Sequence, residues 1–331
     1  MNSYFIFLNK PVGITSQQLL TQYKRSLPKG TKVGHHGTLD PFADGLMLVA
    51  VGEACKFISY VDDSRKTYVA TLKLGQKTDT GDLTGQVIEE RAVPCEASAK
   101  QGDGAIFNPT EITLREKISS IFQGFTGVTE QIPPMYSAIK IDGVPLYKMA
   151  RAGEVVERKP RQIEIFDLKL LAHTPPANSS ENPLLQRGGR GSFLRFEVTC
   201  SRGTYIRTLA EDIALRMGTV GHLTALTRTK LCGFSGSWQG DGANLAGGAL
   251  GVVSGFEGVG EQIQIADLLR HHFKVELNTE QKTLAYHGKI VPLAAPIATA
   301  QDQIVALFCD DVFLGMADWQ NDGLKVRRLL Q

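Results

Sequence analysis

Apolar residues recur along the first hundred residues with the periods of both strands and helices. Three apolar or alternating runs predict buried strands: Tyr4 to Leu8, Leu46 to Val51 and Thr67 to Leu74. Between the first two runs, Thr15 and Gln18 have the spacing of a capping box, which predicts a helix that begins there. This part of the chain therefore mixes both element types.

Three further elements are predicted in the middle of the chain. Thr113 to Phe125 has a helical pattern, and Phe193 to Cys200 alternates apolar with polar residues, as a half-buried strand does. A second helix has Thr204 as its expected N-cap and Gly218 at the C′ position. In this helix Arg207 lies in the first turn.

Composition divides the chain further. Stretches rich in Gly, Ala, Ser or Pro predict surface loops or a linker: 95–109, 173–191 and 240–260. After the last of these, Ile304 to Cys309 and Val312 to Met316 are short strand-like runs, so a small β-rich domain is expected from about residue 263. A chain of 331 residues is long enough for two domains.

Charge becomes informative once it is localised. The whole chain carries +2, but residues 187–230 contain eight basic and three acidic side chains, which gives +5. Such a segment suits a polyanionic partner, although it can also be a solvated face. The five cysteines form no C-x-x-C pair, and no leader or membrane-spanning stretch is evident. We therefore expect a cytoplasmic protein without a membrane partner.

The segment Gly34 to Pro41 is the densest candidate for chemistry and is expected to be a loop. Three interpretations compete: Asp40 caps a turn, or it binds a metal with His35 and His36, or it is a nucleophile or general base. The third requires a cation near the carboxylate, and Arg207 is a candidate, because a carboxylate would offset its position at a helix N-terminus.

Five motifs together resemble the bacterial tRNA pseudouridine synthase B family. The resemblance covers nearly the whole chain, and the motifs are Lys10 to Ser16, Gly34 to Pro41, Lys66 to Tyr68, Cys200 to Arg207 and Leu223 to Arg228. The chain departs from the family pattern at His36, where Thr is expected, and in longer loops around Lys100 and Ser180.

The resemblance implies a fold and a domain organisation. It implies an α+β pseudouridine synthase fold over residues 1–255, with a mixed, mainly antiparallel sheet, flanking helices and a central cleft. A thumb insertion at about 131–161 and a small C-terminal PUA-like domain at 263–331 would grip RNA. It implies no cofactor, no metal and no protein partner for a monomer that acts on the T-arm of tRNA.

The resemblance also implies the roles of individual residues. Asp40 is expected to be the nucleophile, with Arg207 as its partner and Tyr68 as an active-site residue that stacks on the base. The other expected substrate contacts are His35, Tyr205, Leu226 and Lys10. The implied reaction converts uridine 55 to pseudouridine by cleavage and re-formation of the glycosidic bond.

Two other functions remain open from the sequence. An RNA chaperone that remodels tRNA without chemistry would explain the basic segments, but not Asp40, Tyr68 and Arg207 together. A metal-dependent RNA hydrolase would use His35 and His36 with Asp40.

Overall fold

The computed structural model of the chain describes residues 3–93, 109–174, 192–235, 260–293, 304–320 and 323–330. Its helices are α1 (Ser16–Lys24), the 3-10 helix η1 (Gly52–Tyr60), α2 (Pro109–Gln123), α3 (Leu146–Arg151), α4 (Ile206–Arg216), α5 (Ile265–Leu268) and α6 (Thr279–Tyr286). Its strands are β1 (Tyr4–Lys10), β2 (Val33–His36), β3 (Asp44–Val51), β4 (Arg65–Leu74), β5 (Gln76–Thr78), β6 (Val87–Glu90), β7 (Gly127–Gln131), β8 (Lys140–Ile141), β9 (Val144–Pro145), β10 (Arg161–Thr174), β11 (Phe193–Ser201), β12 (Gly221–Leu231), β13 (Phe234–Ser235), β14 (Gln262–Ile263), β15 (Phe273–Glu276), β16 (Ile304–Cys309), β17 (Val312–Gln320) and β18 (Gly323–Leu329).

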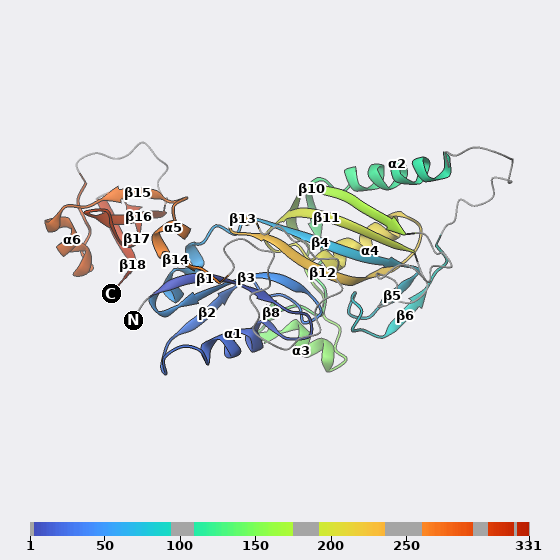
Figure 1. Cartoon of the computed structure of the whole chain (residues 1–331), viewed down its shortest axis with the longest axis horizontal. Helices are drawn as coiled ribbons and strands as arrows, with labels where there is room; N and C mark the ends of the chain where they lie inside the picture. Colours follow the sequence, from blue (N-terminus) through green and yellow to red (C-terminus); the bar gives the residue numbers. More distant parts are fainter. Residues whose placement is uncertain are drawn as a thin grey trace.

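A large sheet runs through the centre of the molecule, in the order β14-β1-β3-β12-β4-β11-β10-β7 (Figure 1). β2 adds to β3 and β13 adds to β12. The pairs are antiparallel except for β3 and β12, which run parallel. Because β14 pairs with β1, residues 262–263 contribute to this sheet and not to the C-terminal sheet.

Strands β1 and β3 are buried on both faces. Alternate residues of the two strands pack on one side with α1, in a cluster that includes Ile6, Met47 and Leu20. The remaining positions pack on the other side against η1, with Phe7 and Leu48 in the cluster. This double coverage explains why the sequence of β3 reads as a continuous apolar run, as predicted for a central strand.

The other half of the sheet is covered by α4 and α2. Alternate residues of β11 enter this core, among them Phe196 and Val198, whereas Arg195 and Glu197 are partly exposed. Ile213 and Leu209 of α4 complete the same cluster. The alternation predicted for this strand and the helix predicted after it are confirmed.

Residues 273–293, 304–320 and 323–330, here named the C-terminal unit, form a four-stranded sheet in the order β15-β16-β17-β18. Figure 1 shows this unit at one end of the molecule, beyond β14. Its Phe313 ring lies 5.4 Å from the Phe57 ring of η1 and belongs to the cluster that also contains Phe5 and Phe7. The strands predicted at 304–309 and 312–316 are confirmed as β16 and part of β17.

Two local predictions are wrong. Val33–His36 is a strand paired with β3, so only the second half of the segment 34–41 is a loop. The glycine and two histidines of β2 give no alternation that reveals this pairing. The second error concerns Thr204, because α4 begins at Ile206 and its N-cap position is Tyr205, which makes no side-chain cap. The Gln131 amide holds both backbone groups of Tyr205 at 2.8 and 3.1 Å, so a neighbouring segment sets the start of the helix.

The capping box of Thr15 and Gln18 is confirmed, and Gly218 follows Met217, the C-cap residue of α4, with φ +83°. The described part of the chain contains no helix long and apolar enough to cross a membrane. Most of the segments predicted as loops or a linker (95–109, 173–191 and 240–260) lie outside the described residues.

Candidate active site

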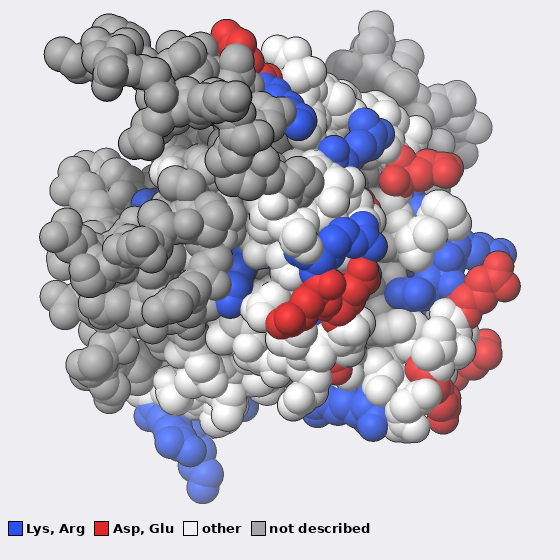
Figure 2. Space-filling model, turned by 90° about the vertical axis from the view of Figure 1, so that its right-hand side faces the viewer, with Lys and Arg blue, Asp and Glu red and all other residues white. Residues whose placement is uncertain are grey.

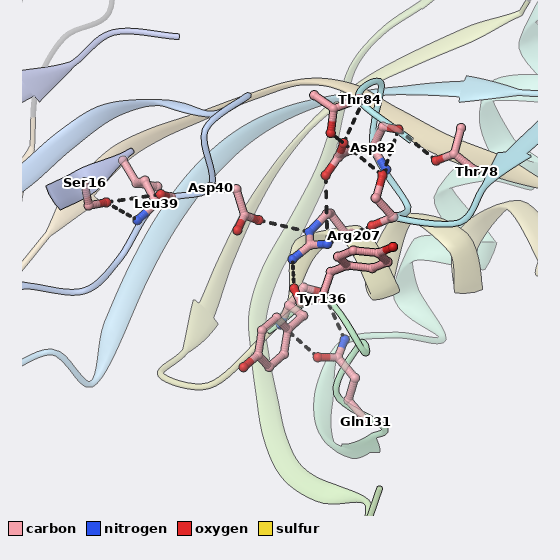
Figure 3. Close-up of polar contacts among 11 residues, drawn as sticks. Ser16, Leu39, Asp40, Thr78, Asp82, Thr84, Gln131, Tyr136 and Arg207 are labelled. Carbon is pink, nitrogen blue, oxygen red and sulfur yellow. Dashed lines mark hydrogen bonds and ion pairs between the residues drawn. The ribbon is translucent and has the colours of Figure 1, made fainter. Parts of the chain in front are cut away.

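The loop between β2 and β3 carries Asp40, and the N-terminal segment holds this loop on both sides of it. The Ser16 hydroxyl accepts from the Leu39 amide at 2.9 Å and donates to the Leu39 carbonyl at 3.1 Å. The Gly13 amide donates to the Pro41 carbonyl at 2.7 Å. Together these contacts fix the backbone immediately before and after Asp40, and Figure 3 shows those between Ser16 and Leu39. The motif that begins at Lys10 therefore supports the loop that carries the candidate nucleophile.

Arg207 joins Asp40 to two other segments. Its Nε lies 2.9 Å from Oδ2 of Asp40, while Nη1 and Nη2 each donate at 2.7 Å, to the carbonyls of Thr80 and Tyr136. Nη1 is also 3.9 Å from Oδ2 of Asp82. The Arg207 side chain is only 5% exposed. Because several acceptors hold the planar guanidinium, its Nε edge is directed at Asp40 (Figure 3).

The Asp40 carboxyl is crowded by protein atoms but retains an open side, since 38% of the side chain is exposed. Loss of surrounding water raises its pKa, the Arg207 charge opposes this rise, and the nearby Asp82 carboxylate adds to it. A raised pKa makes the carboxylate a stronger base and nucleophile than an exposed Asp. The open side allows a substrate atom to approach it.

Asp82 is a second carboxylate at the site that the sequence did not single out. It is buried in the turn between β5 and β6, where its Oδ1 accepts from the Thr80 hydroxyl at 3.0 Å and from the Thr84 amide at 2.9 Å. The sequence around Asp82 does show a turn rich in Thr, Asp and Gly between two short strands. Nothing in that pattern indicated that the turn meets Arg207.

Tyr68 and Leu226 lie on neighbouring strands and are buried in the cluster that also contains Leu39. Tyr68 is opposite Arg228 in the register of β4 and β12. Burial raises the pKa of Tyr68, while the Arg228 guanidinium opposes the rise and the Asp40 charge adds to it. Tyr68 therefore lies near both Arg228 and Asp40.

Tyr205 approaches Asp40 and Arg207 from the segment before α4. Burial raises the pKa of its hydroxyl, and the nearby Ser137 side chain and the Arg207 charge oppose the rise. The Gln131 amide fixes the Tyr205 backbone, as described above. Gln131 is a second residue that the sequence left without a role, because its partner is 74 positions away.

Arg228 donates hydrogen bonds to the backbone at the start of the Asp40 loop and in β3. Its Nη2 donates to the Gly37 carbonyl at 2.9 Å and its Nε to the Leu46 carbonyl at 2.7 Å, and the residue is 1% exposed. Arg207 and Arg228 belong to the basic segment 187–230, so part of that positive charge lies inside the protein. On the face shown in Figure 2, the described basic side chains are interspersed with acidic ones and form no patch of one sign.

Lys10, expected to contact substrate, is fully buried. Its Nζ donates to the carbonyls of Pro11, Ile14 and Pro41 at 2.9, 2.8 and 3.5 Å. Burial lowers the pKa of Lys10 to about 8, against the opposing effects of Asp44 and Asp40. This geometry gives the ammonium a part in holding the Asp40 loop and leaves it no surface that could touch RNA.

The two histidines of β2 have different surroundings. Neighbouring residues of a strand point to opposite faces. His36 has its Nε2 within ion-pair distance of Asp63, 2.9 Å from Oδ2, whereas no ion pair is found for His35 among the described residues. Neither Nε2 of His36 nor Nδ1 of His35, both buried, makes a hydrogen bond within the described part of the chain. Burial and then the Arg228 charge lower the pKa of His35. No group of three or more His, Cys, Asp or Glu residues in the described part of the chain is arranged to hold a metal. The interpretation of His35, His36 and Asp40 as ligands of one ion therefore has no geometric support.

Known proteins resemble this chain in both sequence and structure. The family model described as TruB family pseudouridylate synthase (N terminal domain) matches residues 24–206. A protein named tRNA pseudouridine synthase B from Hydrogenovibrio crunogenus is 37% identical over 98% of this chain and 92% of its own length. Its namesake from Azoarcus sp. is 37% identical over 98% of this chain and 94% of its own length.

Among solved structures, that of a Cbf5-Nop10-Gar1 complex contains a chain that aligns with 98% of this one and 84% of its own length, with a TM-score of 0.59 and 20% identity. This likeness and the mixed, mainly antiparallel sheet confirm the predicted α+β pseudouridine synthase fold. The relatives confirm the resemblance drawn from the motifs. The chain therefore belongs to the TruB family of pseudouridylate synthases.

Proposed function

We propose that this chain isomerises uridine 55 in the T-arm of tRNA to pseudouridine, with Asp40 as the nucleophile. The observation that carries the proposal is the contact of 2.9 Å between Asp40 and a buried Arg207, on a loop fixed on both sides of Asp40. Family membership and the tRNA named in the relatives' names support the choice of substrate.

The target uridine would first be flipped from the stacked T-loop into the site, at a cost of a few kcal/mol. Tyr68 would stack on the base, with Tyr205 and Leu226 as walls of the pocket. His35 would hold the displaced RNA, and the low pKa of its imidazole suits a neutral hydrogen-bonding role. For Lys10, the buried ammonium favours support of the loop over direct contact with substrate.

The Asp40 carboxylate would then add to the ribose or the base, or remove a ribose proton, so that the C1′–N1 bond breaks. Uracil rotates, a C1′–C5 bond forms as any bond to Asp40 breaks, the C5 proton leaves to solvent, and N1 takes up a proton. The reaction is an isomerisation with no redox change, so it requires neither an electron acceptor nor an imported group. Arg207 orients the carboxylate and limits the rise of its pKa.

Binding energy would come from two parts of the chain. We assign the thumb to residues 131–161 and the PUA-like domain to residues 263–331, with the catalytic domain at 1–255. A cavity of ≈ 980 Å³ lies between η1 and the C-terminal unit, and its lining includes Lys56, Tyr286, Arg327 and Arg328. Basic and aromatic side chains suit the backbone and bases of RNA. Action as a monomer in the cytoplasm remains a prediction.

The deciding experiment is Asp40→Asn with a tRNA transcript labelled with tritium at C5 of uridine. Loss of tritium release is expected, with RNA affinity within about tenfold of wild type. Asp167→Asn, which changes a partly exposed carboxylate on β10, is the matched control and should retain activity. Normal release by Asp40→Asn would refute the nucleophile.

The site of modification is tested separately, by mapping pseudouridine in RNA incubated with the wild-type protein. Pseudouridine at position 55 alone is the expected result. If wild-type protein forms no pseudouridine but accelerates tRNA annealing, the function is that of an RNA chaperone.

A further inference from the structure

His36 and Asp63 form a contact beside the Asp40 loop that the reaction scheme does not use. The Nε2 of His36 lies 2.9 Å from Oδ2 of Asp63, and the two side chains are only 17% and 16% exposed. The Lys66 ammonium lies 3.1 Å from the same oxygen. One carboxylate oxygen thus accepts a hydrogen bond from Lys66 and lies within ion-pair distance of His36, whose buried Nε2 makes no hydrogen bond among the described residues. Both the imidazole and the carboxylate are mostly buried, which sets this contact apart from an ordinary surface ion pair.

Asp63 belongs to residues 61–64, here named the connector, which link η1 to β4. Before the connector, the Tyr60 carbonyl faces Nε2 of His272 at 2.7 Å and Nε2 of His271 at 3.1 Å. After the connector, β4 is paired with β11 and β12 along its length. Within it, the Ser64 amide donates to Oδ1 of Asp62 at 2.9 Å. The connector is therefore held at both ends, and Asp63 is a fixed point on it.

His36 is the last residue of β2 and directly precedes the loop. The next residue, Gly37, has φ +70° and accepts from Arg228 through its carbonyl. Further along, Ser16 and Gly13 hold the backbone on both sides of Asp40. The His36–Asp63 contact adds a side-chain anchor at the point where the strand becomes the loop. It links the loop to the segment that leads into Tyr68.

We propose that His36 is a positioning residue for the Asp40 loop and acts through Asp63 of the connector. The kinetic part of this inference rests on the proposed isomerase activity. Without the contact, the start of the loop has one anchor fewer, and Asp40 and His35 spend more time away from their working positions. Displacements of about 1 Å in an active site can reduce the rate by up to about a hundredfold.

The kinetic test compares single-turnover rates of full-length His36→Ala, His36→Gln and wild type on the tRNA transcript. His36→Ala should be slower by about tenfold, with its Kd for tRNA changed less than about twofold. His36→Gln keeps a side-chain N–H donor and should recover most of the rate. His287→Ala, in the exposed C-cap histidine that follows α6, is the matched control and should behave as wild type.

A double-mutant cycle tests whether the effect passes through Asp63. If it does, His36→Ala combined with Asp63→Ala should be no slower than the slower of the two single variants. Fully additive losses would overturn the coupling. A His36→Ala rate equal to that of wild type would overturn the positioning role itself.

A readout independent of activity is amide hydrogen exchange of peptides that cover residues 33–43. Exchange should increase in His36→Ala, stay near the wild-type level in His36→Gln, and not change in His287→Ala. Unchanged exchange in His36→Ala would overturn the proposed anchor. If wild type releases no tritium while His36→Ala still loosens the loop, the proposed function fails and the anchor stands.

Discussion

The surroundings of Asp40 and the C-terminal unit both contain basic side chains, but they use them in opposite ways. Near Asp40, the charged groups of Arg207, Arg228 and Lys10 are buried and donate to backbone carbonyls. In the C-terminal unit, Lys274 and Arg327 lie at the surface and pair with the carboxylates of Asp311 and Asp318. The same residue types are thus structural in one region and solvated in the other.

The difference shows what a positive charge contributes in each place. A buried guanidinium leaves several carbonyls without donors when it is removed, so its loss disturbs the loop geometry that the chemistry requires. An exposed cation is screened by salt and contributes little to stability, but it remains available to phosphates. We therefore expect substitutions near Asp40 to change rate or stability, and substitutions in the C-terminal unit to change RNA affinity.

The largest expected effect is that of Arg207→Lys. An ammonium cannot contact Asp40 and the carbonyls of Thr80 and Tyr136 in the fixed planar arrangement of a guanidinium, so the single-turnover rate should fall at least about a hundredfold. Tritium release measures it. Arg216→Lys, in an exposed arginine at the end of the same helix, is the control. A near-normal rate for Arg207→Lys would show that catalysis does not require a planar guanidinium at this position.

Arg228→Gln should reduce stability more than any exposed substitution on the same strand. The carbonyls of Gly37 and Leu46 would lose buried donors, and the free energy of unfolding should fall by about 2–4 kcal/mol. Chemical denaturation measures this change. Lys230→Gln, two residues further along β12 and exposed, should leave the unfolding free energy almost unchanged. Equal effects of the two variants would contradict the contrast between buried and exposed cations.

The pH dependence of the rate probes the balance of charges at Asp40. The anion is the active form, so the rate should be complete above the pKa of Asp40 and decline as pH falls through it. Because burial and Asp82 raise this pKa, the decline should begin above the ordinary value of 3.8. Asp82→Asn removes one raising charge and should move the midpoint to lower pH. A midpoint shifted upward would contradict the assigned electrostatics.

The smallest effect is expected from Arg328→Gln in the C-terminal unit. This exposed side chain lines the cavity beside η1, so its loss should weaken tRNA binding a few-fold and reduce the slope of log Kd against log salt by about 1. The free energy of unfolding should not change measurably. A large loss of stability would show that Arg328 is structural, as the buried cations near Asp40 are, and would contradict the comparison.

The periodic elements were predictable because their signals are local. The alternation of β11, the continuous apolar run of β3 and the capping box of α1 each follow from neighbouring residues, and the structure confirms all three. The prediction for β2 was wrong because its pairing with β3 supplies what its own residues do not. The N-cap of α4 was misplaced because Gln131, from a distant segment, fixes Tyr205.

The sequence by itself identified Asp40, Tyr68, Tyr205 and Arg207 as a set and gave the family through the order of its motifs. The predicted pairing of Arg207 with Asp40 agrees with the structure, but only the tertiary structure decided that Asp82 and Arg228 complete the surroundings and that Lys10 is buried. The reason is physical. The periods of helices and strands depend on residues that are neighbours in the sequence. The partners of a buried charge are carbonyls and carboxylates of distant segments, which meet only after the sheet has formed.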